Sequence, residues 1–200
     1  MARISRAESH AQTRGALLKA AREVFVELGV NAASIDAITE RAGYSKGAYY
    51  SNFPSKEAIM VTLLEEHMDM EVAALTEIIG TADTVDHLFA RLAQLYKDMH
   101  AEPSICILDF EYQLLAIRNP EISTQYGQRW ETHLGNLSAL VDVAATRLHF
   151  RLSMQAAELI ENIAALSNGL VISRLTMPSK SATPIHEVML GYLRSCILPR

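Results

Sequence analysis

The sequence predicts an all-α fold of about nine helices, with a three-helix domain at residues 1–54 and a helical body at residues 55–200. Three observations predict it. Apolar side chains recur at helical spacing along most of the chain. Pro103, Pro120 and Pro184 follow polar breaks, and a proline is tolerated in the first turn of a helix. No segment shows the sustained alternation of apolar and polar residues that is typical of a β-strand.

The first helix is expected over residues 10–28, where Val24, Phe25 and other apolar residues follow helical spacing. Gly29 ends this helix, because glycine adopts the left-handed backbone conformation that closes many helices. Residues 1–9 are polar and mixed in charge, so we expect no stable structure there.

Two short helices joined by a turn follow. Ser34 can cap the first, because its hydroxyl can accept a hydrogen bond from a free amide of the first turn. Gly43 stands at the end of that helix, and Ser45 can cap the next one, whose inward face carries Tyr49 and Phe53. This arrangement predicts a helix-turn-helix, a motif whose second helix can enter the major groove of DNA.

The body is expected to be helical throughout. Its first helix begins after a cap at Ser55 and ends at Gly80. The helix near residue 165 is apolar on more than one face and therefore needs two packing partners. The predicted body helices cover residues 55–79, 84–100, 103–118, 120–150, 153–177 and 183–197.

The charge of the chain is unevenly distributed. The formal net charge is −5, yet residues 1–56 carry eight basic and five acidic side chains, whereas residues 57–200 carry ten and eighteen. A basic first domain on an acidic body suits a protein in which only that domain meets phosphate.

Many residues of the first domain match a known pattern at fixed spacing: Ala20-Ala21, Phe25, Gly29, Ser34-Ile35, Ile38, Ala42-Gly43, Ser45-Lys46-Gly47, Tyr50, Phe53 and Ser55-Lys56-Glu57. With these residues, the stretch from Arg14 to Leu64 resembles the DNA-binding region of the tetracycline-repressor-like (TetR/AcrR) family of transcriptional regulators. The resemblance covers about a quarter of the chain. Thr39 and Asn52 depart from it, because a small Ala and a His or Tyr are usual at those positions.

The resemblance implies a DNA-binding surface. Lys46 is the best candidate for reading a base, since an ammonium group can donate to O6 and N7 of guanine. Asp36 cannot donate to phosphate, and we expect it to complement the helix N-terminus. The residues that the resemblance places in the DNA-binding set are Ser34, Ser45, Lys46, Gly47, Ala48, Tyr50, Asn52 and Lys56.

The resemblance also implies a cavity for a small-molecule effector in the body. Aromatic and methionine side chains on three successive helices are the candidates, although such residues at helical spacing are more often plain core. Their sparse charge favours an apolar or aromatic effector. The candidate residues are Phe89, Tyr96, Met99, Phe110, Tyr112, Leu114, Tyr126, Trp130 and His133.

By the same resemblance, the last two helices pair with those of a second copy to form a homodimer. The alternative is that both helices pack only within their own chain. The residues expected at the interface are Leu159, Ile163, Leu166, Gly169, Leu170, Ile172, Val188, Met189 and Tyr192.

Other classes of function find little support in the sequence. The histidines have no nearby partner at metal-ligand spacing, and no nucleophile, phosphate loop or dinucleotide motif occurs, so we expect no enzyme, no metal and no other cofactor. Cys106 and Cys196 lie in apolar surroundings, where a buried, inert thiol is expected. No signal peptide or membrane-spanning run is evident, which predicts a cytoplasmic protein.

We therefore interpret the chain as a ligand-responsive, sequence-specific transcriptional regulator. The expected mode is that of a homodimeric repressor, which a small apolar or aromatic effector releases from a palindromic DNA operator. The alternative is a helical small-molecule-binding protein without specific DNA binding. An enzyme on the same scaffold comes third.

Overall fold

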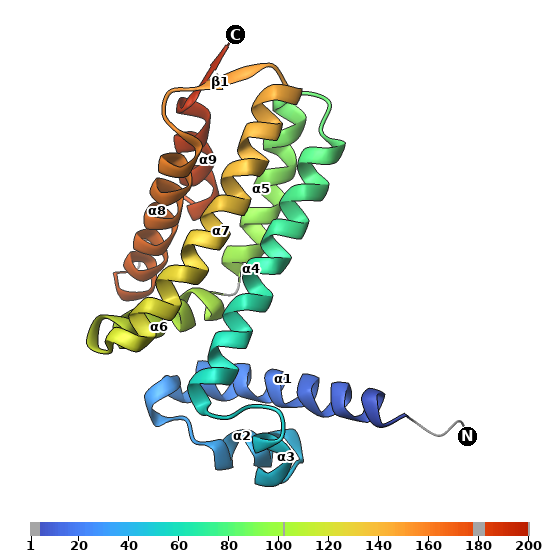
Figure 1. Ribbon diagram of the computed structural model, residues 1–200. Helices are drawn as coiled ribbons and strands as arrows, with labels where there is room; N and C mark the ends of the chain where they lie inside the picture. Colours follow the sequence, from blue (N-terminus) through green and yellow to red (C-terminus); the bar gives the residue numbers. More distant parts are fainter. Residues whose placement is uncertain (1–4, 102, 178–182, 200) are drawn as a thin grey trace. The chain divides into compact units, whose positions relative to one another are not determined.

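The computed structural model describes residues 5–101, 103–177 and 183–199 (Figure 1). The chain divides into two compact units. The first combines the chain up to His67 with Ile107–Tyr112, and the second combines Met68–Cys106 with the chain from Gln113 onward. The division differs from the predicted boundary after residue 54, because the first turns of a long helix and the middle of another pack with the N-terminal helices.

Over the described residues, the first unit contains three whole helices, the start of a fourth and the middle of α6 (Ser104–Arg118). In Figure 1, α1 lies across α2 and α3, and the turn between α2 and α3 is tight. The helices are α1 (Arg6–Ala32), α2 (Ile35–Ala42), α3 (Lys46–Tyr50) and the beginning of α4 (Lys56–Thr81).

Helix α1 begins earlier than the sequence analysis expects. The Ser5 hydroxyl accepts from the Glu8 amide at 3.2 Å, and the Glu8 carboxylate accepts from the Ser5 amide at 2.7 Å. These bonds lower the pKa of the Glu8 carboxyl below its usual value. This reciprocal capping box supplies partners for two otherwise free amides. The expectation of no structure over residues 1–9 is therefore wrong from Ser5 onward.

Gly29 interrupts α1 as expected, but the chain then makes one more helical turn. Gly29 has φ 77° and ψ 157°, a conformation accessible to glycine because it lacks a Cβ. The Ala33 amide donates to the Gly29 carbonyl at 3.0 Å and closes the added turn, which leads directly into α2.

Tyr49 and Phe53 lie in the core of the first unit, as predicted. Their ring centroids are 5.9 Å apart, and the Arg14 guanidinium lies over the Phe53 ring. Burial raises the pKa of the Tyr49 phenol, which stays protonated and donates to the Ser55 carbonyl at 2.9 Å. This hydrogen bond ties α3 to the start of α4.

The second unit is a helical bundle with one small strand pair. Within it, α7 packs on α8, α5 packs on α9, and α8 packs on α9. With the rest of α4, its elements are α5 (Val85–Ala101), α6 (Ser104–Arg118), α7 (Pro120–Arg147), β1 (Phe150–Leu152), α8 (Ala156–Thr176), α9 (Ile185–Ser195) and β2 (Ile197–Pro199). The predicted all-helical architecture of nine helices is thus confirmed over the described residues.

The strand pair is absent from the sequence-based expectation. Strands β1 and β2 pair antiparallel, with Leu152 opposite Ile197. His149 precedes β1 with φ 57°, which lets the chain turn sharply away from α7. Three-residue strands are too short to show alternation, and their partners lie far apart in the sequence, so no local pattern reveals them.

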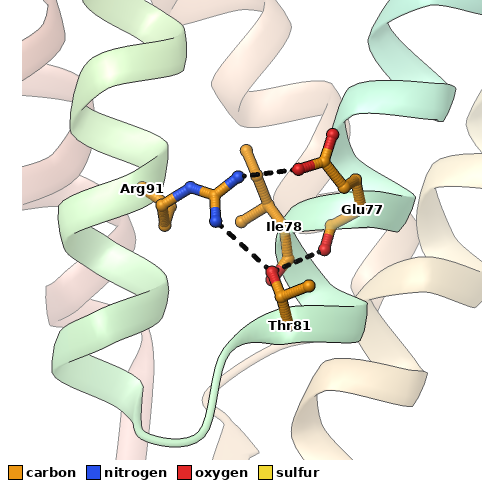
Figure 2. A network of polar contacts seen from close by, with 4 residues as sticks. All are labelled: Glu77, Ile78, Thr81 and Arg91. Atoms are coloured by element: carbon orange, nitrogen blue, oxygen red, sulfur yellow. Dashed lines mark hydrogen bonds and ion pairs between the residues drawn. The ribbon is translucent and has the colours of Figure 1, made fainter.

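A polar network closes the corner between α4 and α5 (Figure 2). Arg91 on α5 donates to the Glu77 carboxylate at 3.1 Å and to the Thr81 hydroxyl at 3.4 Å. The Thr81 hydroxyl in turn donates to the Glu77 carbonyl at 2.8 Å. The network gives partners to groups at the C-terminal end of α4, where carbonyls lack helical partners.

The core of the second unit is apolar. Its buried members come from α4, α5, α7, β1, α8 and α9 and from the residues next to them: Ile78, Ile79, Ala82, Leu88, Leu92, Tyr96, Ala144, Phe150, Leu159, Ile163, Met189 and Cys196. Cys196 is buried as expected, whereas Cys106 is only half-buried. Among the described residues, no helix combines the length and the apolar character that crossing a membrane would require.

Candidate functional site

Two serine caps fix the turn between α2 and α3. The Ser34 hydroxyl accepts from the Ala37 amide at 3.1 Å, and the Ser45 hydroxyl accepts from the Ala48 amide at 3.2 Å. Gly43 has φ 71° and ψ 30°, the left-handed conformation that ends α2. The predicted caps therefore form, and both hydroxyls bind backbone within the domain.

The turn and α3 present one exposed face. Lys46 and Gly47 are exposed, and Tyr50 exposes 56% of its surface. Gly47 is exposed and has no side chain, so the backbone of this part of α3 can come close to a large partner. Tyr44 also lies on the exposed turn, a residue that the sequence analysis missed. The sequence feature that could have indicated Tyr44 is its place as an aromatic residue directly after the turn glycine, Gly43.

Lys46 is held by an acidic neighbour. Its ammonium lies 2.6 Å from the Asp36 carboxylate, and this hydrogen bond raises the pKa of Lys46 above its usual value. Both side chains are exposed. Asp36 is in the first turn of α2, as expected, and it also bonds to the candidate base-reading residue. Because an ammonium has three donors, Lys46 can keep this partner and still donate to a base.

Lys56 has a role inside the domain. Its ammonium donates to the carbonyls of Val30 and Ala33, the latter at 2.9 Å, and also lies 3.4 Å from the Asn31 carbonyl. An ammonium has three donors, and all three are directed at the end of α1. Lys56 therefore has a structural role in the first unit, and its expected phosphate contact stays a prediction.

Asn52 also points inward. Its side-chain amide donates to the Ala48 carbonyl at 2.8 Å, and its Oδ1 is buried without a hydrogen-bond partner. This arrangement ties Asn52 to α3 itself, and it does not match the expected phosphate contact. Of the predicted DNA-binding set, the exposed members on this face are Ser34, Ser45, Lys46, Gly47 and Tyr50, with Ala48 half-buried.

The second unit contains an apolar cavity of about 70 Å³. Helices α4, α5, α7, α8 and α9 and both strands line it, through residues that include Leu92, Tyr96, Ala144, Phe150 and Ile163. Of the predicted effector set, only Tyr96 lines this cavity. Small-molecule sites are commonly about 300–1,000 Å³, so a ligand here would have to push the helices apart.

The other predicted effector residues lie elsewhere. Phe110 and Tyr112 belong to the first unit, and Leu114 is exposed. Phe89 lies under the Arg194 guanidinium, beside an open groove between α5 and α9. The remaining members are half-buried or buried in the second unit: Met99, Tyr126, Trp130 and His133.

A buried polar pair crosses from α4 to α7. The His133 Nε2 lies 3.1 Å from the Glu71 carboxylate, and the Trp130 ring lies beside the imidazole, with centroids 6.0 Å apart. His133 is therefore a paired residue inside the bundle. Among the described residues, no group of three or more potential metal ligands comes together.

Helix α8 carries an exposed apolar stripe. Gly169, Ile172 and Leu175 follow one another at three-residue spacing, and Ile172 and Leu175 expose 37% and 50% of their surface. By contrast, Leu159, Ile163 and Met189 are buried in the core of their own chain. These three residues pack within their own chain, and their expected place at an interface stays a prediction.

The other predicted interface residues are half-buried: Leu166, Leu170, Val188 and Tyr192. Three of them pack at the edge of the core: Leu166, Leu170 and Tyr192. Met177, just beyond the end of α8, extends the exposed stripe and was missed by the sequence analysis.

Comparison with known families gives a match in the first unit. Residues 17–63 match the family described as "Bacterial regulatory proteins, tetR family". The chain is 41% identical over 70 residues to the transcriptional activator FasR of Mycolicibacterium smegmatis, covering 35% of this chain and 32% of FasR. It is 30% identical over 105 residues to the transcriptional repressor KstR2 of Mycobacterium tuberculosis, covering 52% of each. The chain thus spans about half the length, or less, of these relatives.

Solved structures resemble the whole fold. A regulator from Saccharomonospora viridis in complex with choline matches with a TM-score of 0.72 at 19% identity, over 95% of this chain and 100% of that chain. FadR from Bacillus subtilis in complex with stearoyl-CoA matches with a TM-score of 0.71 at 17% identity, over 90% and 95%. At such identities the likeness concerns the fold, and it extends through the body as well as the first unit.

Proposed function

We propose that the chain is a regulator of the tetR family, because residues 17–63 match that family, and that it acts as a homodimeric repressor which a small apolar effector releases from an inverted-repeat operator. The family consists of regulatory proteins rather than enzymes. The observation that carries the proposal is the exposed face of α3, where Lys46 and Tyr50 project from a helix capped at Ser45.

The residue types on this face suit DNA. A lysine ammonium can donate to guanine or to phosphate, and a tyrosine hydroxyl can donate to phosphate. Gly47 and Ala48 are small, which allows the backbone of α3 to come close to the floor of the major groove. The excess of basic side chains in residues 1–56 attracts the duplex before specific contacts form.

A second copy of the chain is proposed to cover the exposed stripe of Gly169, Ile172 and Leu175 on α8. Two recognition helices related by a two-fold axis then face successive major grooves, about 34–36 Å apart. Such an assembly requires an operator with two inverted half-sites.

The effector is proposed to be apolar because the cavity in the second unit has apolar walls. The fold neighbour from B. subtilis binds stearoyl-CoA, a ligand with a long apolar chain, and the neighbour from S. viridis binds choline. An apolar chain suits the present cavity better than a quaternary ammonium, because the cavity contains no carboxylate. Because the cavity is small, the ligand can enter only when the helices move apart. The ligand therefore has a higher affinity for the state with separated helices than for the state with packed helices.

A second candidate function is a small-molecule binder without specific DNA binding. It is favoured by the internal engagement of Lys56 and by the pairing of Lys46 with Asp36, which together reduce the free positive charge of the first unit. The two candidates predict different behaviour toward DNA.

A gel-shift experiment separates them. Duplexes that cover the DNA flanking the protein's own coding region are mixed with the protein, with a shuffled duplex of equal composition as the control. The repressor predicts a shifted band that survives excess shuffled DNA and disappears on addition of long-chain fatty acids or acyl-CoA. Equal binding to both duplexes would favour the second candidate.

A further inference from the structure

The peptide unit of Val30 is held from two sides by charged groups. The Val30 amide donates to the Glu111 carboxylate on α6, and the Val30 carbonyl accepts from the Lys56 ammonium at the start of α4. Lys56 also binds the Ala33 carbonyl at 2.9 Å. We name this arrangement, with Gly29, Val30, Ala33, Lys56 and Glu111, the Val30 clamp.

The kink at Gly29 explains why a carboxylate is needed there. The helical turn after the kink begins afresh, so the Val30 amide has no helical partner. Val30 is almost fully buried, with 2% of its surface exposed, so water cannot readily replace a lost partner. Glu111 therefore serves as a cap that is supplied from another helix.

Glu111 lies on the face of α6 that belongs to the first unit. Leu108 and Tyr112, three residues before and one after Glu111, are both buried. Only Ile107–Tyr112 of α6 is part of the first unit, and the flanking turns of the same helix are part of the second. Because a helix moves as a stiff rod, a shift of α6 that starts in the second unit displaces the Glu111 carboxylate.

The Val30 clamp lies next to the start of α2 in the chain, and α2 leads into α3. The turn from Val30 to Ala32 ends at Ala33, and Ser34 caps α2 immediately afterwards. Fixing the Val30 peptide therefore fixes the start of α2, and α3 follows α2 through the tight turn at Gly43.

We propose that Glu111 is the positioning residue through which α6 controls the DNA-binding helices. With its hydrogen bond to Val30 formed, α2 and α3 are held in the orientation that fits the operator; when α6 shifts, the bond breaks and operator affinity falls. This inference rests on the proposed function and assigns its regulation to one side chain.

The test uses the full chain and three variants. Glu111→Ala removes the acceptor, and Glu111→Gln keeps a neutral acceptor of the same size. Glu131→Ala, which removes an exposed carboxylate from α7 in the second unit, is the matched control. Circular dichroism establishes that each variant is folded, and Glu111→Gln carries the test if Glu111→Ala does not fold.

The first readout is hydrogen exchange of the amides from Val30 to Ile38, which needs no DNA. Glu111→Ala loses the charge-assisted hydrogen bond to the Val30 amide, so we expect amide exchange about tenfold or more faster in this variant. We expect a smaller change in Glu111→Gln and none in Glu131→Ala. Unchanged exchange at Val30 would overturn the inference.

The second readout is affinity for an operator selected from a random-sequence pool, compared with affinity for a random duplex. Glu111→Ala is expected to lose about 5- to 150-fold in operator affinity, with random-duplex binding unchanged, because the exposed face of α3 remains intact. If the wild type has a sharp sequence preference and Glu111→Ala has the same preference, the inference about Glu111 is overturned and the proposed function stands. A wild-type protein without any sequence preference would overturn the proposed function and the inference together.

Discussion

At the scale of single residues, Gly29 has the most demanding backbone position. Its φ of 77° suits glycine, and a Cβ built there would lie 3.3 Å from the Glu111 carboxylate. Gly15, in the middle of the regular first part of α1, has open space at the same position. The two glycines thus offer a matched comparison within one helix.

Gly29→Ala is expected to destabilise the protein by about 1–3 kcal/mol, through backbone strain and the close contact with Glu111. Gly15→Ala is expected to stabilise it by up to about 1 kcal/mol, because alanine favours a helix interior. Urea unfolding followed by circular dichroism measures both. If the two variants were equally stable, the positive φ at Gly29 would not be a constraint.

Lys46 gives a second prediction at this scale, through its partner Asp36. Asp36→Asn removes a negative charge from the DNA-binding face and leaves the ammonium free, so affinity for any duplex is expected to rise, with a steeper dependence on salt. Fluorescence anisotropy at several salt concentrations measures the effect. Glu40→Gln, which alters an exposed carboxylate on the same helix, is the control. An equal rise in both variants would mean that total charge, and not the freeing of Lys46, is responsible.

At the scale of elements, helix α8 has two different faces. Leu159 and Ile163 are buried in their own chain, whereas Gly169, Ile172 and Leu175 form an exposed stripe. The sequence pattern indicates that this helix is apolar on more than one side but does not assign each residue to a side. Only the packing of α7 and α9 on α8 separates them.

Ile172→Glu is expected to split the proposed dimer, because the charge would be desolvated in an apolar contact. Light scattering at micromolar concentration measures the mass. Val143→Glu, an equally drastic change at an exposed apolar residue of α7, should leave the dimer intact. A dimeric Ile172→Glu variant would place the interface on another surface.

Elements with local signals could be predicted from the sequence, and those with distant partners could not. The caps at Ser34 and Ser45 and the turn at Gly43 depend on neighbours within four residues, and all three form as expected. The β1–β2 pair, the engagement of Lys56 and the role of Glu111 depend on residues at least 23 positions away. The lining of the apolar cavity depends on distant residues as well, since α8 and α9 line it together with α4, α5 and α7.

At the scale of the whole molecule, we propose that two equilibria are linked. An apolar effector favours a state of the second unit with a larger cavity, and the operator favours the state with the Val30 clamp formed. A ligand shifts the equilibrium only by its difference in affinity for the two states. Typical coupling of about 1–3 kcal/mol corresponds to a 5- to 150-fold loss of operator affinity. Both α4 and α6 run from one unit into the other and can carry this coupling.

The central claim is that the exposed face of α3 reads a DNA sequence. The most direct measurement selects binding sites from a random duplex pool with the full-length protein and compares the enriched site with all its single-base variants, for the wild type and for Lys46→Ala. The account predicts an inverted repeat, and a loss of discrimination in Lys46→Ala of roughly 5- to 150-fold at one base pair of each half-site. A pool without enrichment, or a Lys46→Ala variant that discriminates as sharply as the wild type at every position, would contradict it.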